Sequence, residues 1–280
     1  MVRFVKIALV QPKAYRFGEE RKNLPLAIKY VEAAAKKGAQ IICFPECYPG
    51  PYSGPINFSP IEDMLRTAQN LGVYILFGAV TKEDNKIYDK TMVASPDGTM
   101  VGEHAKIVSG PADKYLSGGK VFTSGSEIDV TDTKLGKIGI LICREVWYPE
   151  LARILALKGA DIIFVPLGNI RYRETLKNIL WSRAIENTVY VACTQNLFLN
   201  EQGFSYIMSP EEIIGENLVE GILVKELDLE RLRLLKESED EGLTEDAPTE
   251  LWLSNKRSYR VIPGLLQYRK PLQIYKSYLE

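Results

Sequence analysis

The chain has 280 residues, a formal net charge of −1 at pH 7 and a hydrophobic share of 46%, which is typical of a globular protein with a sizeable core. Lys and Arg form no basic stripe, so we do not expect a nucleic-acid partner. No apolar run approaches the roughly 20 residues that cross a bilayer, and the charged start Met1–Lys6 is unlike a signal peptide. We therefore expect a cytoplasmic protein with no membrane partner.

The first half of the chain alternates apolar runs with amphipathic stretches. Apolar runs predict three strands, at residues 5–10, 41–44 and 73–80. Helical spacing predicts a helix over 23–37, and a capping box of Ser59 and Glu62 predicts a second helix that ends at Gly72. The turn Ser95–Gly98 indicates a hairpin of strands 88–94 and 100–107.

The second half continues this mixture of strands and helices. Further strands are expected at residues 137–143, 161–166, 189–194, 204–208 and 221–225. Further helices are expected at residues 150–158, 175–187 and 229–235. Hairpins combined with strand–helix alternation argue against a purely parallel sheet. We predict one α/β domain over residues 1–280, a four-layer α-β-β-α sandwich of two mixed sheets with outer helices.

Residues 237–280 differ in composition from the rest of this domain. The segment 237–250 is acidic and poor in apolar residues, which predicts a solvated loop or, alternatively, an interaction segment. The residues that follow include Trp252, Ile262 and Leu266. They are too apolar for a free tail, so we expect this C-terminal extension to pack on the body or on a partner subunit.

The cysteines and the single histidine limit the possible chemistry. Cys43 and Cys47 lack the spacing of a zinc pair, and Cys143 and Cys193 form no second pair, so we predict no metal. No Gly-rich phosphate loop is present, which argues against nucleotide chemistry. His104 is the only imidazole that a papain-like Cys–His pair could use. A packed or exposed histidine is the alternative.

Three polar residues follow or end predicted strands, namely Glu46, Lys106 and Cys143. Sites in open α/β sheets form at the carboxyl ends of strands, so the three positions can converge. A cysteine at a strand-to-helix turn lies near N–H groups that favour thiolate and bind an oxyanion. An ammonium group stabilises the same charges, and a carboxylate transfers protons. The pattern fits acyl transfer, although each residue alone also fits a packed or surface role.

Several short blocks resemble the nitrilase, or carbon–nitrogen hydrolase, superfamily in their order and spacing. The blocks are Phe44–Glu46, Asp97–Lys106 and Gly136–Glu150, with support from Gly159–Asp161, Arg183–Asn187 and Asn196. The resemblance implies that Cys143 is the nucleophile, Glu46 the general base and Lys106 the oxyanion stabiliser. It also implies that no metal or organic cofactor is needed. A homodimer or larger homo-oligomer is implied too, and the helices at 150–158 and 175–187 are our interface candidates.

The sequence departs from the family pattern at four places, one of which is Val108, where a His commonly stands two residues after the Lys. Glu145 stands where amidase-like members usually carry Asp and nitrile-hydrolysing members carry Glu. Many members carry a second pocket Glu between the Lys and the nucleophile, but Asp113 is the only acidic residue in the segment 109–120. Leu197 stands where a small residue usually follows the Asn at position 196. We expect a hydrolase of a small amide or N-carbamoyl compound. A nitrile hydrolase with the same triad and a non-catalytic ligand-binding descendant are the alternatives.

Five further residues are candidates for binding the substrate. Arg144 follows the proposed nucleophile, and Arg171 and Arg173 follow a strand that we expect beside the one carrying Cys143. Guanidinium groups bind carboxylates in bidentate fashion, so this group predicts a substrate with a carboxylate. Solvent exposure or pairing with nearby Glu residues is the alternative. Tyr52 and Trp147 are expected to form an apolar wall.

Overall fold

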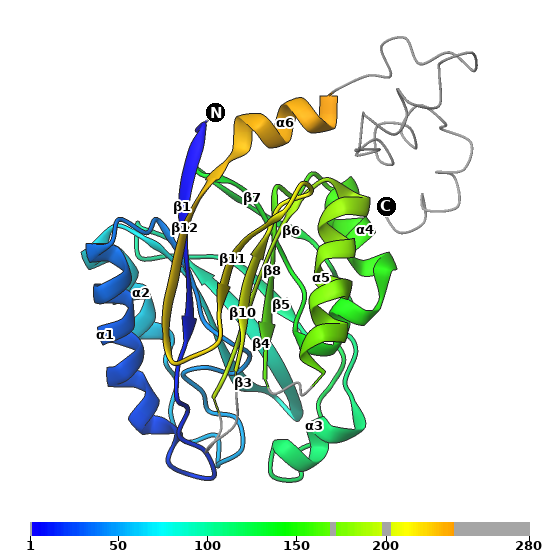
Figure 1. Ribbon diagram of the computed structural model, residues 1–280. Helices are drawn as coiled ribbons and strands as arrows, with labels where there is room; N and C mark the ends of the chain where they lie inside the picture. The colour runs from blue at the N-terminus through cyan, green and yellow to red at the C-terminus, as the bar shows by residue number, and fades with distance from the viewer. Residues whose placement is uncertain (1, 169–171, 198–202, 238–280) are drawn as a thin grey trace, which may run out of the picture.

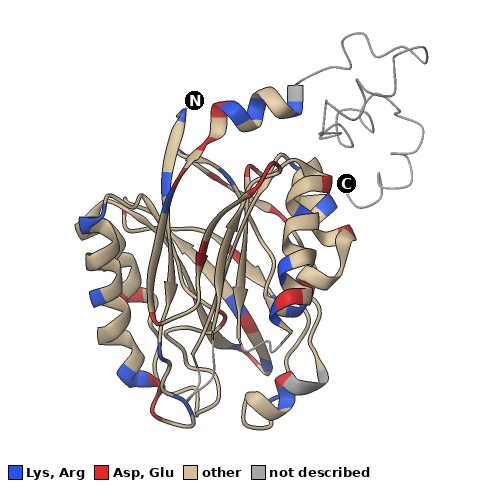
Figure 2. Ribbon diagram, viewed as in Figure 1, with Lys and Arg blue, Asp and Glu red and all other residues tan. Residues whose placement is uncertain are grey.

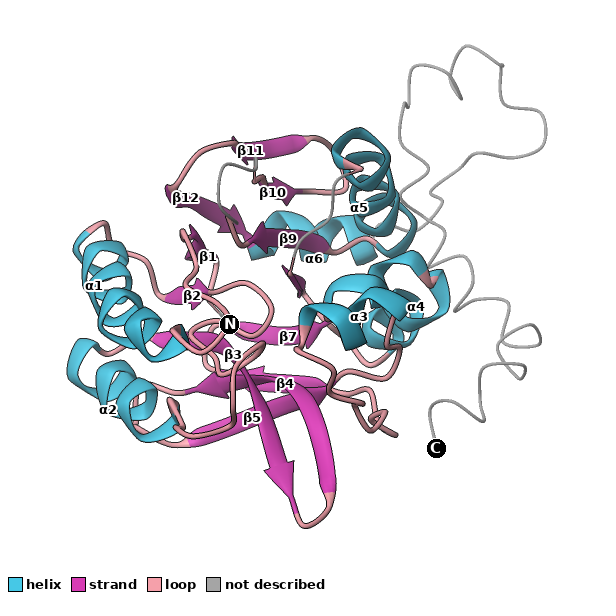
Figure 3. Ribbon diagram, turned by 90° about the horizontal axis from the view of Figure 1, so that it is seen from below, coloured by secondary structure: helices cyan, strands magenta, loops and turns pink. Residues whose placement is uncertain are grey.

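The computed structural model describes residues 2–168, 172–197 and 203–237. Within these residues two six-stranded sheets pack face to face, and helices cover their outer faces (Figure 1). The view along the sheets separates the layers, with α1 and α2 on one side and α4 and α5 on the other (Figure 3). The predicted α-β-β-α sandwich is therefore confirmed.

The first sheet has the strand order β12-β1-β2-β3-β4-β5. Its strands are β1 (Phe4–Gln11), β2 (Ile41–Cys43), β3 (Tyr74–Glu83), β4 (Lys86–Ala94), β5 (Met100–Ala105) and β12 (Gly221–Asp228). Strands β1, β2 and β3 are parallel, and the others join antiparallel. The helices α1 (Asn23–Lys36) and α2 (Ile61–Leu71) cover its outer face.

The second sheet repeats this plan with the order β11-β10-β9-β8-β7-β6. Its strands are β6 (Val130–Thr133), β7 (Gly136–Ile140), β8 (Ile162–Leu167), β9 (Tyr190–Gln195), β10 (Ser205–Met208) and β11 (Ile213–Asn217). Strands β7, β8 and β9 are parallel. The helices α4 (Pro149–Leu157) and α5 (Arg173–Asn187) cover its outer face. Each sheet thus has a parallel centre with three carboxyl ends on one edge.

Strand β1 shows why the first sheet is buried on both faces. Val5, Ile7 and Leu9 belong to the core shared with the second sheet, whereas Ala8 and Val10 belong to the core under α1 and α2. Side chains alternate between the two faces of a strand, so a strand covered on both sides reads as one apolar run. Burying each large aliphatic side chain contributes about 1.5–3 kcal/mol.

The start of α2 differs from the predicted capping box. Pro60 is the N-cap residue, and no side-chain hydrogen bond caps the helix. The Ser59 hydroxyl instead accepts a hydrogen bond from the Ile61 N–H at 3.3 Å. The predicted end is confirmed, because Gly72 adopts the left-handed conformation with φ 66°, which costs glycine little.

Three short elements were missed, namely α3 (Pro111–Leu116), β6 and β11. Each is too short for a clear period, and the two strands are partly exposed edge strands. Strand β7 also ends at Ile140 rather than at Cys143, where the 3-10 helix η2 (Cys143–Trp147) begins. A second 3-10 helix, η1 (Glu20–Lys22), precedes α1.

The helix α6 (Leu229–Glu237) ends the described part of the chain. The predicted acidic loop and C-terminal extension fall on residues 238–280, outside the described residues. No helix among the described residues is long and apolar enough to cross a membrane. Positive and negative residues are intermixed along α5 and α6, so neither helix carries a stripe of one sign (Figure 2).

Candidate active site

The structure brings Glu46, Lys106 and Cys143 together between the carboxyl ends of the two sheets. Glu46 follows β2, Lys106 follows β5 and Cys143 follows β7. Lys106 Nζ donates a hydrogen bond to Glu46 Oε1 at 2.6 Å, and the Glu46 carboxyl group hydrogen-bonds with the Cys143 thiol. Glu46 and Lys106 are almost fully buried, and Cys143 is 9% exposed. The three side chains form one connected, buried cluster.

The backbone of Cys143 adopts the left-handed conformation, with φ 51°. This conformation costs a non-glycine residue about 1–3 kcal/mol, so the surrounding structure must hold it. Leu141 remains bonded to the second sheet, because its N–H donates to the Phe164 carbonyl at 3.0 Å. The turn thus directs the Cys143 side chain from the strand end into the cluster.

Glu145 is fully buried and holds this turn in place. Its Oε2 accepts the N–H of Ile142 at 2.6 Å, and its Oε1 accepts the N–H of Ile107 at 2.6 Å. His104 Nε2 also lies 2.8 Å from Glu145 Oε2. One carboxylate therefore joins the turn that carries Cys143 to the strand end that carries Lys106.

The same contact decides the position of His104. Its ring is 6% exposed and hydrogen-bonds to Glu145. Among the contacts of the described residues, none is a hydrogen bond between His104 and Cys143. The Cys–His pair of a papain-like protease is therefore not formed, and His104 takes the packed role.

Gly168 follows β8 and brings a backbone N–H to the cluster. This N–H hydrogen-bonds to the Cys143 sulfur. A Cβ atom at Gly168 would lie 2.3 Å from Glu46 Oε2, so a side chain there would displace the Glu46 carboxylate. The close approach needs glycine. The sequence analysis missed this residue, although a glycine directly after an apolar strand was a usable signal.

Asp113 supplies a second carboxylate at the ammonium group. Lys106 Nζ donates to Asp113 Oδ2 at 2.9 Å, and the Gly110 N–H donates to the same oxygen at 2.6 Å. Asp113 lies in the first turn of α3, which the sequence analysis did not predict. The segment 109–120 therefore does place a carboxylate in the cluster, as an Asp.

Asp89 is a third carboxyl group that the sequence analysis missed. It lies on β4 and is 1% exposed. Its Oδ1 accepts a hydrogen bond from Cys47 Sγ at 3.0 Å, its Oδ2 lies 3.7 Å from Lys106 Nζ, and it hydrogen-bonds with Glu46. An acidic residue inside the apolar run 88–94 was the signal.

The electrostatics of the cluster favour a neutral thiol beside an ionised base. Burial, followed by the Glu46 charge, raises the pKa of Cys143 well above its usual value, although Lys106 and the Gly168 N–H oppose this. Burial alone would raise the pKa of Glu46, but the Lys106 charge and hydrogen bonds from its neighbours lower it. Burial opposes a charged Lys106, yet Glu46, Cys143 and the other carboxyl groups raise its pKa well above the usual value. At rest, Glu46 can accept the thiol proton.

Asn196 fixes the backbone of Glu46 from the second sheet. Asn196 follows β9, and its Nδ2 donates to the Glu46 carbonyl oxygen at 3.0 Å. The amide is buried, so water does not compete for this hydrogen bond. This contact sets the position of the carboxylate relative to the second sheet.

The predicted substrate-binding residues are dispersed. Tyr52 is buried, and its ring lies near Glu46 and Cys47. Arg144 is exposed beside Gly110, and Trp147 is 37% exposed. Arg173 is partly exposed and pairs with Glu174 at 2.9 Å, as the alternative interpretation expected. Arg171 lies outside the described residues.

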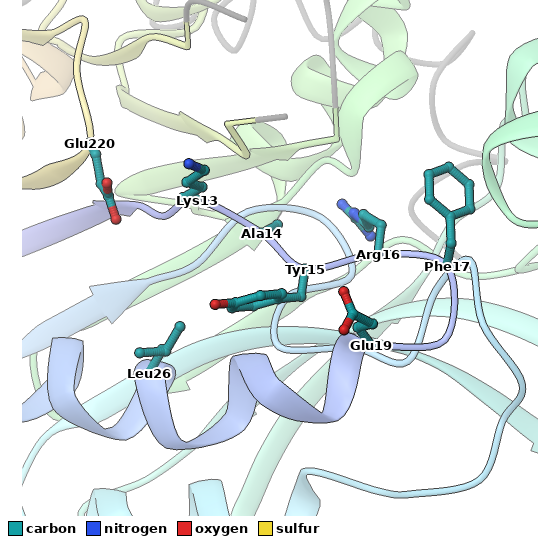
Figure 4. Close-up of a pocket in the computed structure, with 8 residues that line it drawn as sticks. All are labelled: Lys13, Ala14, Tyr15, Arg16, Phe17, Glu19, Leu26 and Glu220. Atoms are coloured by element: carbon teal, nitrogen blue, oxygen red, sulfur yellow. The ribbon is translucent and has the colours of Figure 1, made fainter. Parts of the chain in front are cut away.

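A pocket of about 490 Å³ lies between the loop after β1 and the start of α1 (Figure 4). Lys13, Tyr15, Arg16, Phe17 and Leu26 are among its lining residues. The guanidinium carbon of Arg16 also lies 4.6 Å from the centre of the Tyr52 ring. Arg16 therefore lies between this pocket and Tyr52, whose ring lies near Glu46 and Cys47.

In the ranges that the structure describes, no group of three or more His, Cys, Asp or Glu side chains is arranged to hold a metal ion. The four cysteines are buried and free of disulfide bonds.

The comparisons with known proteins bear on this geometry. The profile of the family described as carbon–nitrogen hydrolase matches residues 6–237. The chain belongs to the carbon–nitrogen hydrolase family. Omega-amidase NIT2-A of Xenopus laevis is 31% identical to this hydrolase over 241 residues, which cover 77% of this chain and 86% of that protein. A nitrilase of Pyrococcus abyssi is 32% identical over 221 residues, which cover 72% and 79%.

Solved structures share the fold of this hydrolase. Nit3 of Saccharomyces cerevisiae, a member of the nitrilase superfamily, matches with a TM-score of 0.73 at 23% identity, covering 88% of this chain and 98% of that chain. An amidase from Nesterenkonia sp. AN1 matches with a TM-score of 0.72 at 22% identity, covering 89% and 96%. The hydrolase is thus an amidase-like enzyme of the nitrilase superfamily, and the non-catalytic alternative is set aside.

Proposed function

We propose that this carbon–nitrogen hydrolase cleaves small amides through a thioester on Cys143, with Glu46 as general base and Lys106 as oxyanion stabiliser. The observation that carries the proposal is the buried chain of contacts from Lys106 through Glu46 to the Cys143 thiol. In the Nesterenkonia amidase, the acetamide moiety of fluoroacetamide is attached covalently to the active site cysteine. That adduct supports a covalent route here.

The first half of the reaction forms the thioester. Glu46 takes the proton of Cys143, and the sulfur attacks the carbonyl carbon of the amide. The ammonium group of Lys106 stabilises the oxyanion of the tetrahedral intermediate together with backbone N–H groups at the turn. Protonated Glu46 passes its proton to the departing nitrogen, so ammonia or an amine leaves.

The second half releases the acid. A water molecule loses a proton to Glu46 and attacks the thioester carbonyl carbon. The second tetrahedral intermediate collapses, and the carbon–sulfur bond breaks. Glu46 returns the proton to the Cys143 sulfur, which restores the resting state with a free carboxylic acid as product. The lowered pKa of Glu46 keeps its carboxyl group ionised at neutral pH, which is the form that can accept a proton in both halves.

The substrate is proposed to carry a carboxylate besides the amide or carbamoyl group. Arg144 is the exposed cation next to Cys143, and Arg171 and Arg173 remain candidates from the sequence. Omega-amidases are among the relatives, which supports a small amide. Tyr52 and Trp147 remain the proposed apolar wall.

A nitrile substrate is the second candidate. Glu145 stands at the position that favours it by resemblance, and one relative is named a nitrilase. Cys143 would add to the nitrile carbon in the same geometry.

A screen for ammonia release tests both candidates. Acidic amides, their neutral analogues, carbamoyl amines and nitriles are offered to the wild type and to Cys143→Ala. We expect the fastest turnover for an acidic amide, and Arg144→Ala should reduce the preference for it over its neutral analogue. Faster turnover of nitriles would make the second candidate the function, and no turnover of any class would refute both.

We also propose that the hydrolase acts as a homodimer or larger homo-oligomer through α4 and α5. Light scattering measures the mass directly, and a single chain at micromolar concentration would refute this.

A further inference from the structure

Asp89 is a buried carboxyl group beside the proposed base that the reaction scheme leaves without a role. It lies in the middle of β4, and its backbone is fixed on both sides. Its pair in β3 is Val80, and its carbonyl oxygen accepts the Lys106 N–H at 2.9 Å. Its side chain therefore faces Glu46 from a rigid position.

The two oxygens of Asp89 have different surroundings. Oδ1 accepts the Cys47 thiol at 3.0 Å. Oδ2 receives no hydrogen bond from any donor in the described part of the chain, and Lys106 Nζ stays 3.7 Å away. Yet the carboxyl group is in hydrogen-bonding contact with the Glu46 carboxyl group. Two carboxyl groups can share such a contact only if one of them carries a proton.

The charge of the cluster requires the same proton. Lys106 bonds to Glu46 and Asp113, and one ammonium group cannot balance three buried carboxylates. The buried Arg16 guanidinium also acts on Glu46 electrostatically, which leaves two cations against three carboxylates. A neutral Asp89 removes the excess negative charge.

The contacts also show which carboxyl group holds the proton. Glu46 receives the close ammonium group at 2.6 Å, which stabilises its anion, whereas Asp89 lacks such a contact. Burial and the neighbouring Glu46 anion raise the pKa of Asp89 well above its usual value. The ionisable groups that face Asp89 are Glu46, Cys47, Lys106 and Tyr52. Lys106 and the hydrogen bond from the Cys47 thiol favour the ionised form, but burial and the Glu46 anion outweigh them.

We propose that Asp89 is a positioning residue, held as a neutral carboxylic acid that donates a hydrogen bond from Oδ2 to Glu46 and fixes the base as an anion aimed at Cys143. Asparagine would reproduce both contacts, because its Nδ2 donates to Glu46 and its Oδ1 accepts from Cys47. Alanine would reproduce neither. The inference rests on the proposed function for the role of Glu46.

The variants Asp89→Asn and Asp89→Ala test this in the full-length protein, with Thr91→Val as control on the same face of β4. Asp89→Asn should keep kcat within about fivefold of the wild type, whereas Asp89→Ala should lose about 100-fold in kcat with little change in KM. The pH profile of Asp89→Asn should overlay that of the wild type between about pH 5 and 9, because no ionisation is lost. If Asp89→Asn is as damaged as Asp89→Ala, or if a titrating group disappears from its profile, the proposal is overturned.

Infrared spectroscopy tests the protonation state without any substrate. The wild type at neutral pH should show the carbonyl stretch of a buried protonated carboxylic acid, absent in Asp89→Asn and retained in Thr91→Val. Spectra without this difference would overturn the proposal, even if Asp89→Ala fails to fold. If the infrared band is present but no compound in the ammonia-release screen is turned over, only the proposed function is refuted.

Discussion

At the scale of single residues, the cluster depends on where each strand ends. Glu46 lies three residues beyond β2, Lys106 one residue beyond β5 and Cys143 three residues beyond β7. Such short extensions keep the side chains close to the hydrogen-bonded sheet. Holding reacting groups in a fixed geometry lowers the entropic part of the barrier. The rigid strand ends therefore support the proposed chemistry.

Replacing the nucleophile is the first test at this scale. Cys143→Ala and Cys143→Ser should lose about 10⁴-fold or more in kcat and remain folded, because the thiol forms the covalent bond and acts as a unit with its base. Steady-state ammonia release measures the loss, and circular dichroism checks the fold. Activity of Cys143→Ala within tenfold of the wild type would refute the thioester mechanism.

The base and the ammonium group give the second test. Glu46→Gln and Lys106→Ala should each lose activity by at least about 100-fold, the first by removing the proton acceptor and the second by removing the charge at the oxyanion. His104→Ala is the matched comparison, because this ring contacts Glu145 and not Cys143. If His104→Ala loses more activity than both, the Cys–His alternative would be restored.

At the scale of elements, Glu145 connects η2 to the end of β5. Its carboxylate satisfies two backbone N–H groups and the His104 ring from a fully buried position. A buried group of this kind is costly to lose because each donor is left without a partner. The relative position of Cys143 and Lys106 therefore depends on one side chain.

Removing this connection should lower stability and activity together. Glu145→Gln keeps one acceptor oxygen but turns an NH2 group toward backbone donors, so we expect a loss of about 2–3 kcal/mol in the free energy of unfolding. Urea unfolding gives the value, and Glu150→Gln, an exposed position on α4, is the control. Equal stability of the two variants would show that Glu145 does not hold the turn.

At the scale of the whole molecule, the buried charges make stability depend on pH. Asp89 has its pKa raised by burial and by Glu46. Above the ordinary pKa of an Asp, about 3.9, the unfolded chain releases this proton while the folded chain keeps it. The unfolded state then binds fewer protons, so the contribution of Asp89 to stability falls as the pH rises.

The variant Asp89→Asn should lack this dependence. Relative to the wild type, its free energy of unfolding should increase with pH by up to about 1.4 kcal/mol per unit from about pH 4 upward. Urea unfolding at several pH values measures the difference, with Thr91→Val as control. A difference that does not change with pH would mean that Asp89 ionises normally in the folded protein.

The sequence by itself determined most of the elements and the three residues of the proposed triad. Strands such as β1 and β8 are buried on both faces, so their apolar runs are visible in one dimension. Glu46, Lys106 and Cys143 were found because each lies near a strand end in a block that resembles the family. Short edge strands and α3 were missed, because a few partly exposed residues carry no clear period.

Only the tertiary structure decided which other groups join the triad. Asp89 lies on β4 of the same sheet as Glu46 and Lys106, Asp113 lies on α3, and Gly168 follows β8 of the second sheet. Only the folded chain brings them to Glu46 and Lys106. Their spacing along the chain carries no trace of that contact. The protonation of Asp89 depends on the same packing, because burial and a neighbouring carboxylate decide where a proton stays. The residues of each strand are enough to predict that strand, whereas the charges of the site interact only in the folded protein.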